Sequence, residues 1–202
     1  MTVLSKSYAS LPVNRREILR YMGCSGDTPE VSALVDRALA LCDGALSFRV
    51  CYAIFPISQN EGVIDLGFTK TESKALQKNL SGCDKIILFC ATVGHSLDRI
   101  IATESVRCPS LAVAVDAVGA ERIEALCDAF CDGMARELEE DGYRLNPRFS
   151  PGYGDLPLTL QGDIVRVLDT QRRLGVTLND ALLMSPSKSV SAIVGVKRYG
   201  AC

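Results

Sequence analysis

The chain has no tryptophan and only one histidine, and its nine cysteines include no Cys-x-x-Cys pair. Structural zinc sites use cysteine and histidine ligands at such short spacings, so little is available to build one. His95 has no serine or cysteine partner at a recognisable spacing, which argues against a hydrolytic triad, and we expect it to begin a helix near the surface. Cys127 and Cys131 should be small core residues on one helix face. The odd number and irregular spacing of the cysteines indicate reduced thiols.

Long hydrophobic runs and an excess of positive charge are also missing. The longest apolar stretches, such as 86–93, are strand-sized and shorter than the roughly 18 residues of a membrane helix. Residues 1–14 contain no apolar core followed by a small-residue cleavage site, so no signal peptide is predicted. The net charge is −2, and no basic stripe is interleaved with aromatic residues. The sequence therefore predicts a cytoplasmic protein that binds neither nucleic acid nor membranes.

Helical and strand patterns are interspersed along the chain without regular alternation. Asn14 followed by Glu17 resembles a capping box, and Thr28-Pro29 marks a second helix start. The expected helices cover residues 14–21, 29–43, 71–80, 95–105, 109–139 and 157–174. The expected strands cover residues 46–55, 63–66, 85–91, 176–184 and 189–197, and the second could pair with the first. No linker or repeat divides the chain, so we predict one α+β domain over residues 1–202.

The segment 146–155, NPRFSPGYGD, contains two prolines and two glycines and cannot form a regular helix or a central strand. Such a stiff loop holds its side chains in fixed directions. Arg148 supplies a planar fork suited to a carboxylate or a phosphate. Gly152 lets a ligand approach the backbone, and Tyr153 offers a flat face with a polar tip. The alternative interpretation is a plain connector between two helices.

A second candidate is the strand-to-helix turn at Gly94, where a helix N-terminus could face a phosphate. Neither a phosphate-loop lysine nor a G-x-G-x-x-G pattern accompanies this glycine. A nucleotide-phosphate site at Gly94 is therefore not favoured.

Three segments in order carry a resemblance to a known family. They are the R-x-x-x-G-Y pattern from Arg148 to Tyr153, the M-x-P-x-x-S-V-S pattern from Met184 to Ser191, and the helix over 116–139. Together they resemble the S-adenosylmethionine-binding activation domain of cobalamin-dependent methionine synthase, with the match strongest over residues 111–196. The resemblance implies an α+β fold in which helices pack around a twisted, mainly antiparallel sheet.

The resemblance also implies a cofactor site. By analogy with the family, Arg148 would pair with the carboxylate of S-adenosylmethionine, and Tyr153 would close the site. A shelf for the adenosine would be formed by the loop residues Phe149, Ser150, Pro151 and Gly152. Asp128 stands where the family has a helical glutamate and is one methylene shorter. For three further polar positions near the site, Gly154, Asp155 and Lys188, we favour a structural role.

The favoured function is that of a stand-alone activation subunit for a cobalamin-dependent methionine synthase. The resemblance implies reductive methylation of cob(II)alamin, with S-adenosylmethionine as methyl donor and a flavodoxin-like protein as electron donor. Cobalamin would be held by the partner's cobalamin-binding module, since the chain has no D-x-H-x-x-G corrinoid motif. The chain would then be a methyltransferase component in methionine biosynthesis rather than a complete enzyme. Two alternatives stay open: a non-catalytic module that binds S-adenosylmethionine or a protein of another corrinoid methyltransferase, and an unrelated structural α+β protein.

Overall fold

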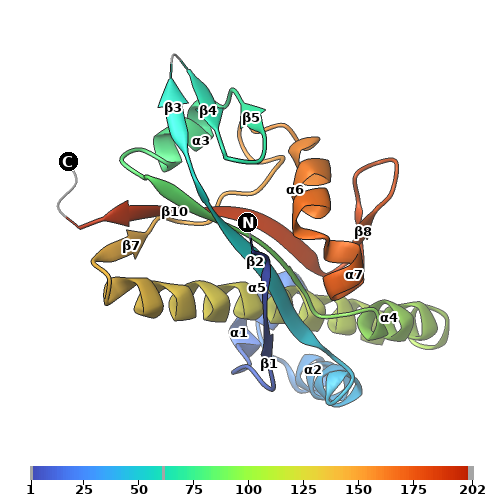
Figure 1. Cartoon of the computed structure of the whole chain (residues 1–202). Helices are drawn as coiled ribbons and strands as arrows, with labels where there is room; N and C mark the ends of the chain where they lie inside the picture. The colour runs from blue at the N-terminus through green and yellow to red at the C-terminus, as the bar shows by residue number, and fades with distance from the viewer. Residues whose placement is uncertain (1, 61, 200–202) are drawn as a thin grey trace.

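A five-stranded antiparallel sheet forms the centre of the computed structural model, which describes residues 2–60 and 62–199 (Figure 1). Its strand order is β1-β2-β6-β10-β7, and every neighbouring pair is antiparallel. The strands are β1 (Leu4–Tyr8), β2 (Phe48–Pro56), β6 (Lys85–Thr92), β10 (Ser189–Arg198) and β7 (Tyr143–Leu145). This architecture confirms the predicted α+β class with a mainly antiparallel sheet.

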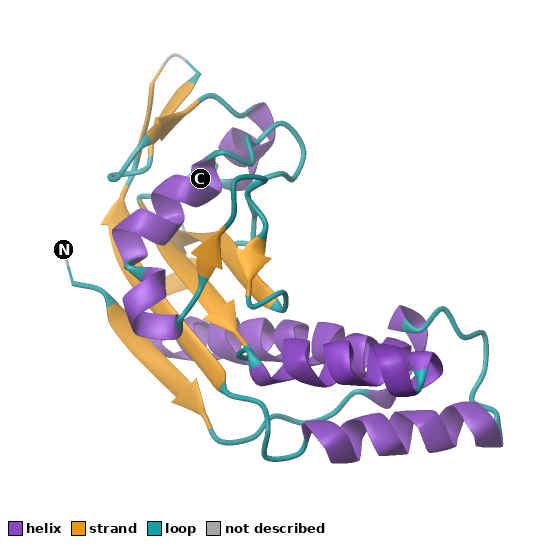
Figure 2. Ribbon diagram, turned by 90° about the vertical axis from the view of Figure 1, so that its right-hand side faces the viewer, coloured by secondary structure: helices purple, strands orange, loops and turns teal. Residues whose placement is uncertain are grey.

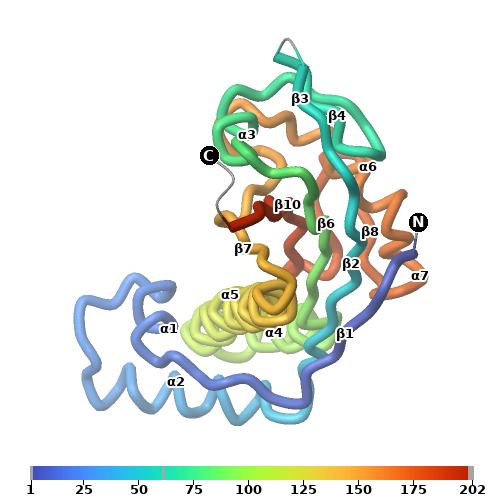
Figure 3. Tube along the Cα trace, turned by 60° about the vertical axis from the view of Figure 1, so that its left-hand side comes forward, coloured from blue at the N-terminus to red at the C-terminus, as the bar shows by residue number. Residues whose placement is uncertain are grey.

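Helices cover both faces of the sheet and leave its three middle strands buried. On one face α5 (Pro109–Glu139) packs on the sheet, and α1 (Arg15–Tyr21), α2 (Pro29–Cys42) and α4 (Ser96–Arg107) pack against α5. The other face packs against α3 (Lys74–Asn79), α6 (Leu160–Leu168) and α7 (Thr170–Leu174). Figure 2 shows the long helices grouped on one side, and Figure 3 shows α6 and α7 on the other side of the sheet from α5. The two hydrophobic clusters explain why β6 is apolar from Ile86 to Ala91, because a strand covered on both faces has no solvent side.

The 31-residue helix α5 is the longest element, and its predicted bounds agree with the structure. Pro109 stands in its first turn, where the missing N–H of proline costs nothing. Its inner stripe buries Val115, Val118, Leu126 and Phe130 against the sheet. The predicted starts of α1 and α2 are also confirmed. The Asn14 side chain accepts from the Glu17 N–H, and the Thr28 side chain accepts from the Val31 N–H.

Several elements differ from the sequence expectations. The single helix expected over 157–174 is two helices, because Asp169 adopts a left-handed conformation between α6 and α7. The strand expected over 63–66 does form, but it pairs within a separate three-stranded sheet and not with β2. That sheet contains β3 (Ser58–Asn60), β4 (Val63–Asp65) and β5 (Lys70–Thr71). Its partners are its own chain neighbours, which are closer in sequence than β2's central residues.

The segment expected as a broken strand over 176–184 is a small hairpin. It consists of β8 (Thr177–Leu178) and β9 (Met184–Ser185), and Figure 1 shows it beside α6. The edge strands β1 and β7 were not predicted. No helix in the described residues combines the length and the apolar character that a bilayer crossing requires.

Candidate functional site

The loop 146–155 continues the sheet edge that β7 begins. Asn146 N–H donates to the Gly195 carbonyl at 2.9 Å. Phe149 and Ile193 exchange two backbone hydrogen bonds, of 2.9 and 2.8 Å. Because successive side chains of an extended segment point to opposite sides, Phe149 enters the core beside Ile193 while Arg148 and Ser150 point away from it.

A cleft of about 300 Å³ opens where this pairing with β10 ends. The loop contributes Ser150 and Pro151, and the M-x-P-x-x-S-V-S segment contributes Met184, Ser187 and residues 189–191. The remaining walls come from α6 with the turn before it and from the tip of the β8–β9 hairpin. Two of the three segments that carry the family resemblance, about 35 positions apart in the chain, thus line the same cavity. Its size lies at the lower end of the range for small-molecule sites.

The turn inside the loop requires glycine. Gly152 has φ +85°, and a Cβ there would lie 3.2 Å from the Leu158 side chain. Its N–H donates to the Leu156 carbonyl at 2.9 Å, which closes the turn. Tyr153 is 72% exposed and stands edge-on to Phe149, with ring centroids 5.6 Å apart. Of the two aromatic residues of the loop, Tyr153 therefore lies at the surface and Phe149 in the core.

Arg148 is held by two carboxylates of α5 and does not line the cleft. Its Nη2 donates to Glu124 at 3.0 Å and to Asp128 at 2.8 Å, and its side chain is 26% exposed. Burial alone would lower the pKa of Arg148, but the surrounding thiols and acids more than offset that effect and keep the guanidinium charged. Ser150, two residues further along, does line the cleft. The loop thus places an ion-paired arginine next to the cavity.

The sequence predicted Asp128 near Arg148 but missed Glu124. The two acids are four residues apart on α5 and therefore occupy one face of the helix, which is a detectable signal. Two buried polar side chains in the cleft, Gln161 and Ser191, were also missed. Gln161 stands three residues before the buried Ile164, on the apolar face of α6, where a polar residue is unexpected.

Asp155 and Gly154, at the end of the loop, and Lys188, in the segment 184–191, have structural roles. Asp155 accepts hydrogen bonds from the Ser73 hydroxyl and from the backbone N–H groups of Lys74 and Ala75, so it ties the loop to the start of α3. These hydrogen bonds, chiefly that from Ser73, lower the pKa of Asp155. Gly154 has φ +58° and packs closely on Ala75. Lys188 forms a 2.8 Å ion pair with Asp116 of α5.

The other sequence candidates also have defined positions. Cys127 lies in the core, where burial raises the pKa of its thiol to about 12, and burial raises that of Cys131 to about 11. His95 is exposed at the start of α4, with Nε2 3.1 Å from the Gly175 carbonyl oxygen. Gly94 is packed so closely against Ser47 that a Cβ would lie 2.4 Å from its hydroxyl oxygen. Within residues 2–60 and 62–199, no three His, Cys, Asp or Glu side chains gather as a potential metal site.

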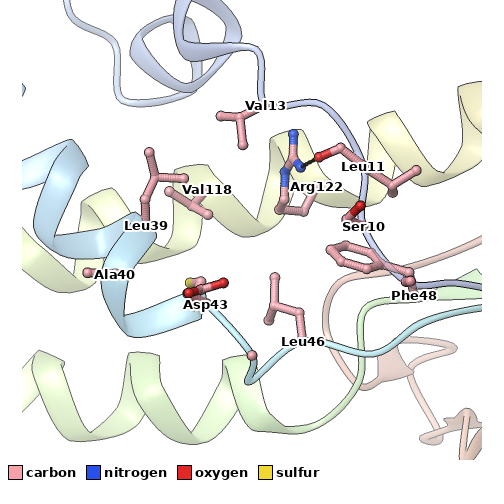
Figure 4. A pocket seen from close by; sticks show the side chains of 13 residues that line it. Ser10, Leu11, Val13, Leu39, Ala40, Asp43, Leu46, Phe48, Val118 and Arg122 are labelled. Carbon is pink, nitrogen blue, oxygen red and sulfur yellow. Dashed lines mark hydrogen bonds between the residues drawn. The ribbon is translucent and has the colours of Figure 1, made fainter.

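A separate cavity of about 430 Å³ lies between the N-terminal segment, α2 and α5 (Figure 4). Arg122 forms part of its wall and is 4% exposed. Its guanidinium donates to the carbonyls of Leu11 and Pro12 at 2.9 and 2.6 Å and pairs with the buried Glu121. Glu121 in turn accepts from the Asn14 N–H at 2.9 Å. This buried pair fastens the N-terminal segment to α5.

Comparison with known proteins gave one kind of match. No protein-family model and no curated protein matches the chain. A solved structure does match: the crystal structure of the MetH reactivation domain bound to AdoHcy, with a TM-score of 0.69 and 18% sequence identity. The alignment covers 96% of this chain and 78% of that one. The chain has the fold of the MetH reactivation domain. This is the fold that the three motifs implied, and at such low identity the likeness establishes the fold alone.

Proposed function

We propose that this protein is an S-adenosylmethionine-binding activation subunit for a cobalamin-dependent methionine synthase. The observation that carries the proposal is the cleft shared by the loop 146–155 and the segment 184–191. Both segments resemble family motifs, and a fold that brings them to one cavity gives the resemblance a physical basis. The AdoHcy in the structural neighbour supports the ligand class, because AdoHcy is S-adenosylmethionine without its transferable methyl group.

The charges beside the cleft complement such a ligand. Arg148, Glu124 and Asp128 offer one cation and two anions. The amino-acid end of S-adenosylmethionine carries one carboxylate and one ammonium, and its sulfonium is a second cation. Under the proposal the ligand's carboxylate takes Arg148 from the two acids, which then face the ligand's positive groups. The exchange is inexpensive because both acids are solvent-exposed, and exposed ion pairs contribute only about 0–1 kcal/mol each.

The protein's task would be to bind and position the ligand. The partner's cobalamin-binding module would bring reduced cobalamin to the sulfonium, and a flavodoxin-like donor would supply the electron. The cobalamin on the partner would supply the acceptor for the methyl group, and the residues of the cleft would hold the ligand in place. Holding two reactants together can be worth several powers of ten in rate, so no acid or base on the subunit is required.

Titration calorimetry on the purified protein tests the first step. We expect saturable binding of S-adenosylmethionine and of AdoHcy to one site, and no binding of either would end the proposal. A reconstitution assay tests the second step. Adding the protein, a reductant and S-adenosylmethionine to the inactive cognate methionine synthase should restore turnover. Binding without any recovery would instead favour a non-catalytic module that serves another corrinoid methyltransferase.

A further inference from the structure

Gln161 is a largely buried residue whose carboxamide borders the cleft and has no hydrogen-bond partner among the described residues. It lies in the first turn of α6 and is 8% exposed. No hydrogen bond among the described residues involves its side chain, and it lines the cleft beside the loop. Its neighbours on α6, Leu160 and Ile164, belong to the second hydrophobic cluster.

The amide nitrogens of two other side chains near this region are bonded within the protein. Gln59 donates to the Leu80 carbonyl at 3.0 Å, and Asn79 donates to the Pro147 carbonyl at 3.1 Å. Water in the cleft can reach the Gln161 amide in the free protein, but a ligand that covers this amide must hydrogen-bond to it or leave it unpaired at a cost in affinity. The Gln161 amide is therefore available to hydrogen-bond a ligand in the cleft.

Ser191, on the opposite wall of the cleft, is a second polar residue with little solvent exposure. It is 4% exposed, lines the same cleft, and its hydroxyl has no hydrogen-bond partner in the described part of the chain. By contrast, the nearby Ser189 hydroxyl donates to the Pro186 carbonyl at 2.8 Å. The backbone of Ser191 is available as well. Hydrogen bonding alternates along a strand, so Ser191 directs its N–H and C=O to the edge that Ile193 uses to pair with Phe149.

We infer that Gln161 reads the nucleobase edge of the ligand and that Ser191 supports it from the opposite wall. A carboxamide presents an acceptor and a donor side by side, which matches the 6-amino group and the adjacent ring nitrogen of adenine. Apolar side chains of Pro151, Leu158 and Met184 line the same cleft and suit the faces of a flat ring. The inference rests on the proposed function and adds a specificity-determining residue to it.

The test compares two ligands on two proteins by calorimetry. The ligands are AdoHcy and an analogue with hydrogen in place of the 6-amino group, and the proteins are the wild type and Gln161→Met. In the wild type, removing the amino group should weaken binding about 10- to 100-fold, because the analogue covers the Gln161 amide without offering the 6-amino group as its hydrogen-bond partner. In Gln161→Met the two ligands should bind within about 2-fold of each other. An equal preference in both proteins would overturn the inference.

Thermal unfolding of the ligand-free proteins tests whether Gln161 has a purely structural role. Gln161 makes no internal hydrogen bond, so Gln161→Met should leave Tm unchanged or raise it. The matched control Gln59→Met loses the bond to Leu80 and should lower Tm without changing the affinity for AdoHcy. A lower Tm in Gln161→Met with unchanged ligand preference would overturn the inference. A wild type that binds neither ligand would overturn the proposed function itself, which makes the two failures distinguishable.

Discussion

Two arginines pair with carboxylates of the same helix, yet they differ in almost every physical respect. Arg122 is buried on the side of the N-terminal segment, where it pairs with the buried Glu121 and binds two backbone carbonyls. Arg148 lies on the loop side, is partly exposed, and uses one nitrogen for two solvent-facing acids, Glu124 and Asp128.

The difference distinguishes an ion pair that stays formed from one that a ligand can replace. The carboxylate partner of Arg122, Glu121, is buried, so removing Arg122 leaves that carboxylate buried without a counterion. The acids around Arg148 can be solvated by water once it leaves them, so a ligand can compete for its guanidinium. Burial of the partners, more than the number of carboxylates, decides the role of each arginine.

The largest effect should follow Arg122→Ala. Because it leaves Glu121 buried without its counterion, we expect the free energy of unfolding to fall by about 3–5 kcal/mol. Urea denaturation measures this loss. The control Arg166→Ala breaks the solvent-exposed pair with Asp163 and should change stability by at most about 0.5 kcal/mol. A loss below about 1 kcal/mol for Arg122→Ala would remove the contrast between the two arginines.

Arg148→Ala should have the opposite effect, with little loss of stability and a clear loss of ligand affinity. Stability should change by at most about 1 kcal/mol, since the pairs that it breaks are solvent-screened. Binding of AdoHcy should weaken by roughly 1.5–3 kcal/mol, the value of a hydrogen bond to a charged group. Calorimetry gives the affinity, and Arg172→Ala, another arginine paired with an exposed aspartate, serves as the control. If affinity is unchanged, Arg148 does not belong to the site.

Glu124→Gln separates two roles for the acids around Arg148. If the acids accept the ligand's cation, binding of S-adenosylmethionine should weaken about two- to fivefold, the value of an exposed ion pair, and the effect should fade at high salt. Asp128→Asn should behave similarly. Calorimetry at low and high ionic strength provides the comparison. Tighter binding would instead mean that Glu124 only competes with the ligand for Arg148.

The smallest expected effect is a change in stability at Asp155, at the far end of the loop, and it depends on pH. The folded-state pKa of Asp155 is lowered, chiefly by the Ser73 hydrogen bond. The resulting stability is present above the ordinary pKa of 3.8 and is lost as pH falls through the lower folded value. Asp155→Asn should therefore have a lower Tm than the wild type at pH 7, with the gap narrowing in acid below that value. A gap of constant size from pH 7 to pH 3 would show that Asp155 acts by shape and not by charge.

Much of the fold could be predicted where local signals and burial agree. The helix α5 has a proline start and a sustained apolar stripe, and residues 86–91 of β6 form an uninterrupted apolar run. The edge strand β1 carries no such signal, because its polar residues pair with β2 only in the folded chain. The break at Asp169 was equally hidden, since aspartate rather than glycine adopts the left-handed conformation there.

The candidate site was predictable in part for the same reasons. Proline and glycine fix the loop locally, so its rigidity and its glycine turn were visible in the sequence. The partner of Arg148 depends on tertiary packing, which brings Glu124 to the loop beside Asp128. Gln161 could have been noticed as a polar residue on an apolar helix face, but only the fold shows that it borders a cleft.

A crystal structure of the protein with AdoHcy would test the central claim most directly. The account predicts the adenine in the cleft between residues 150–151 and 184–191, with its edge against Gln161, and the ligand's carboxylate on Arg148. Arg148 would have left at least one of its two acids. Ligand bound instead in the cavity beside Arg122, with Arg148 still held by Glu124 and Asp128, would contradict the account.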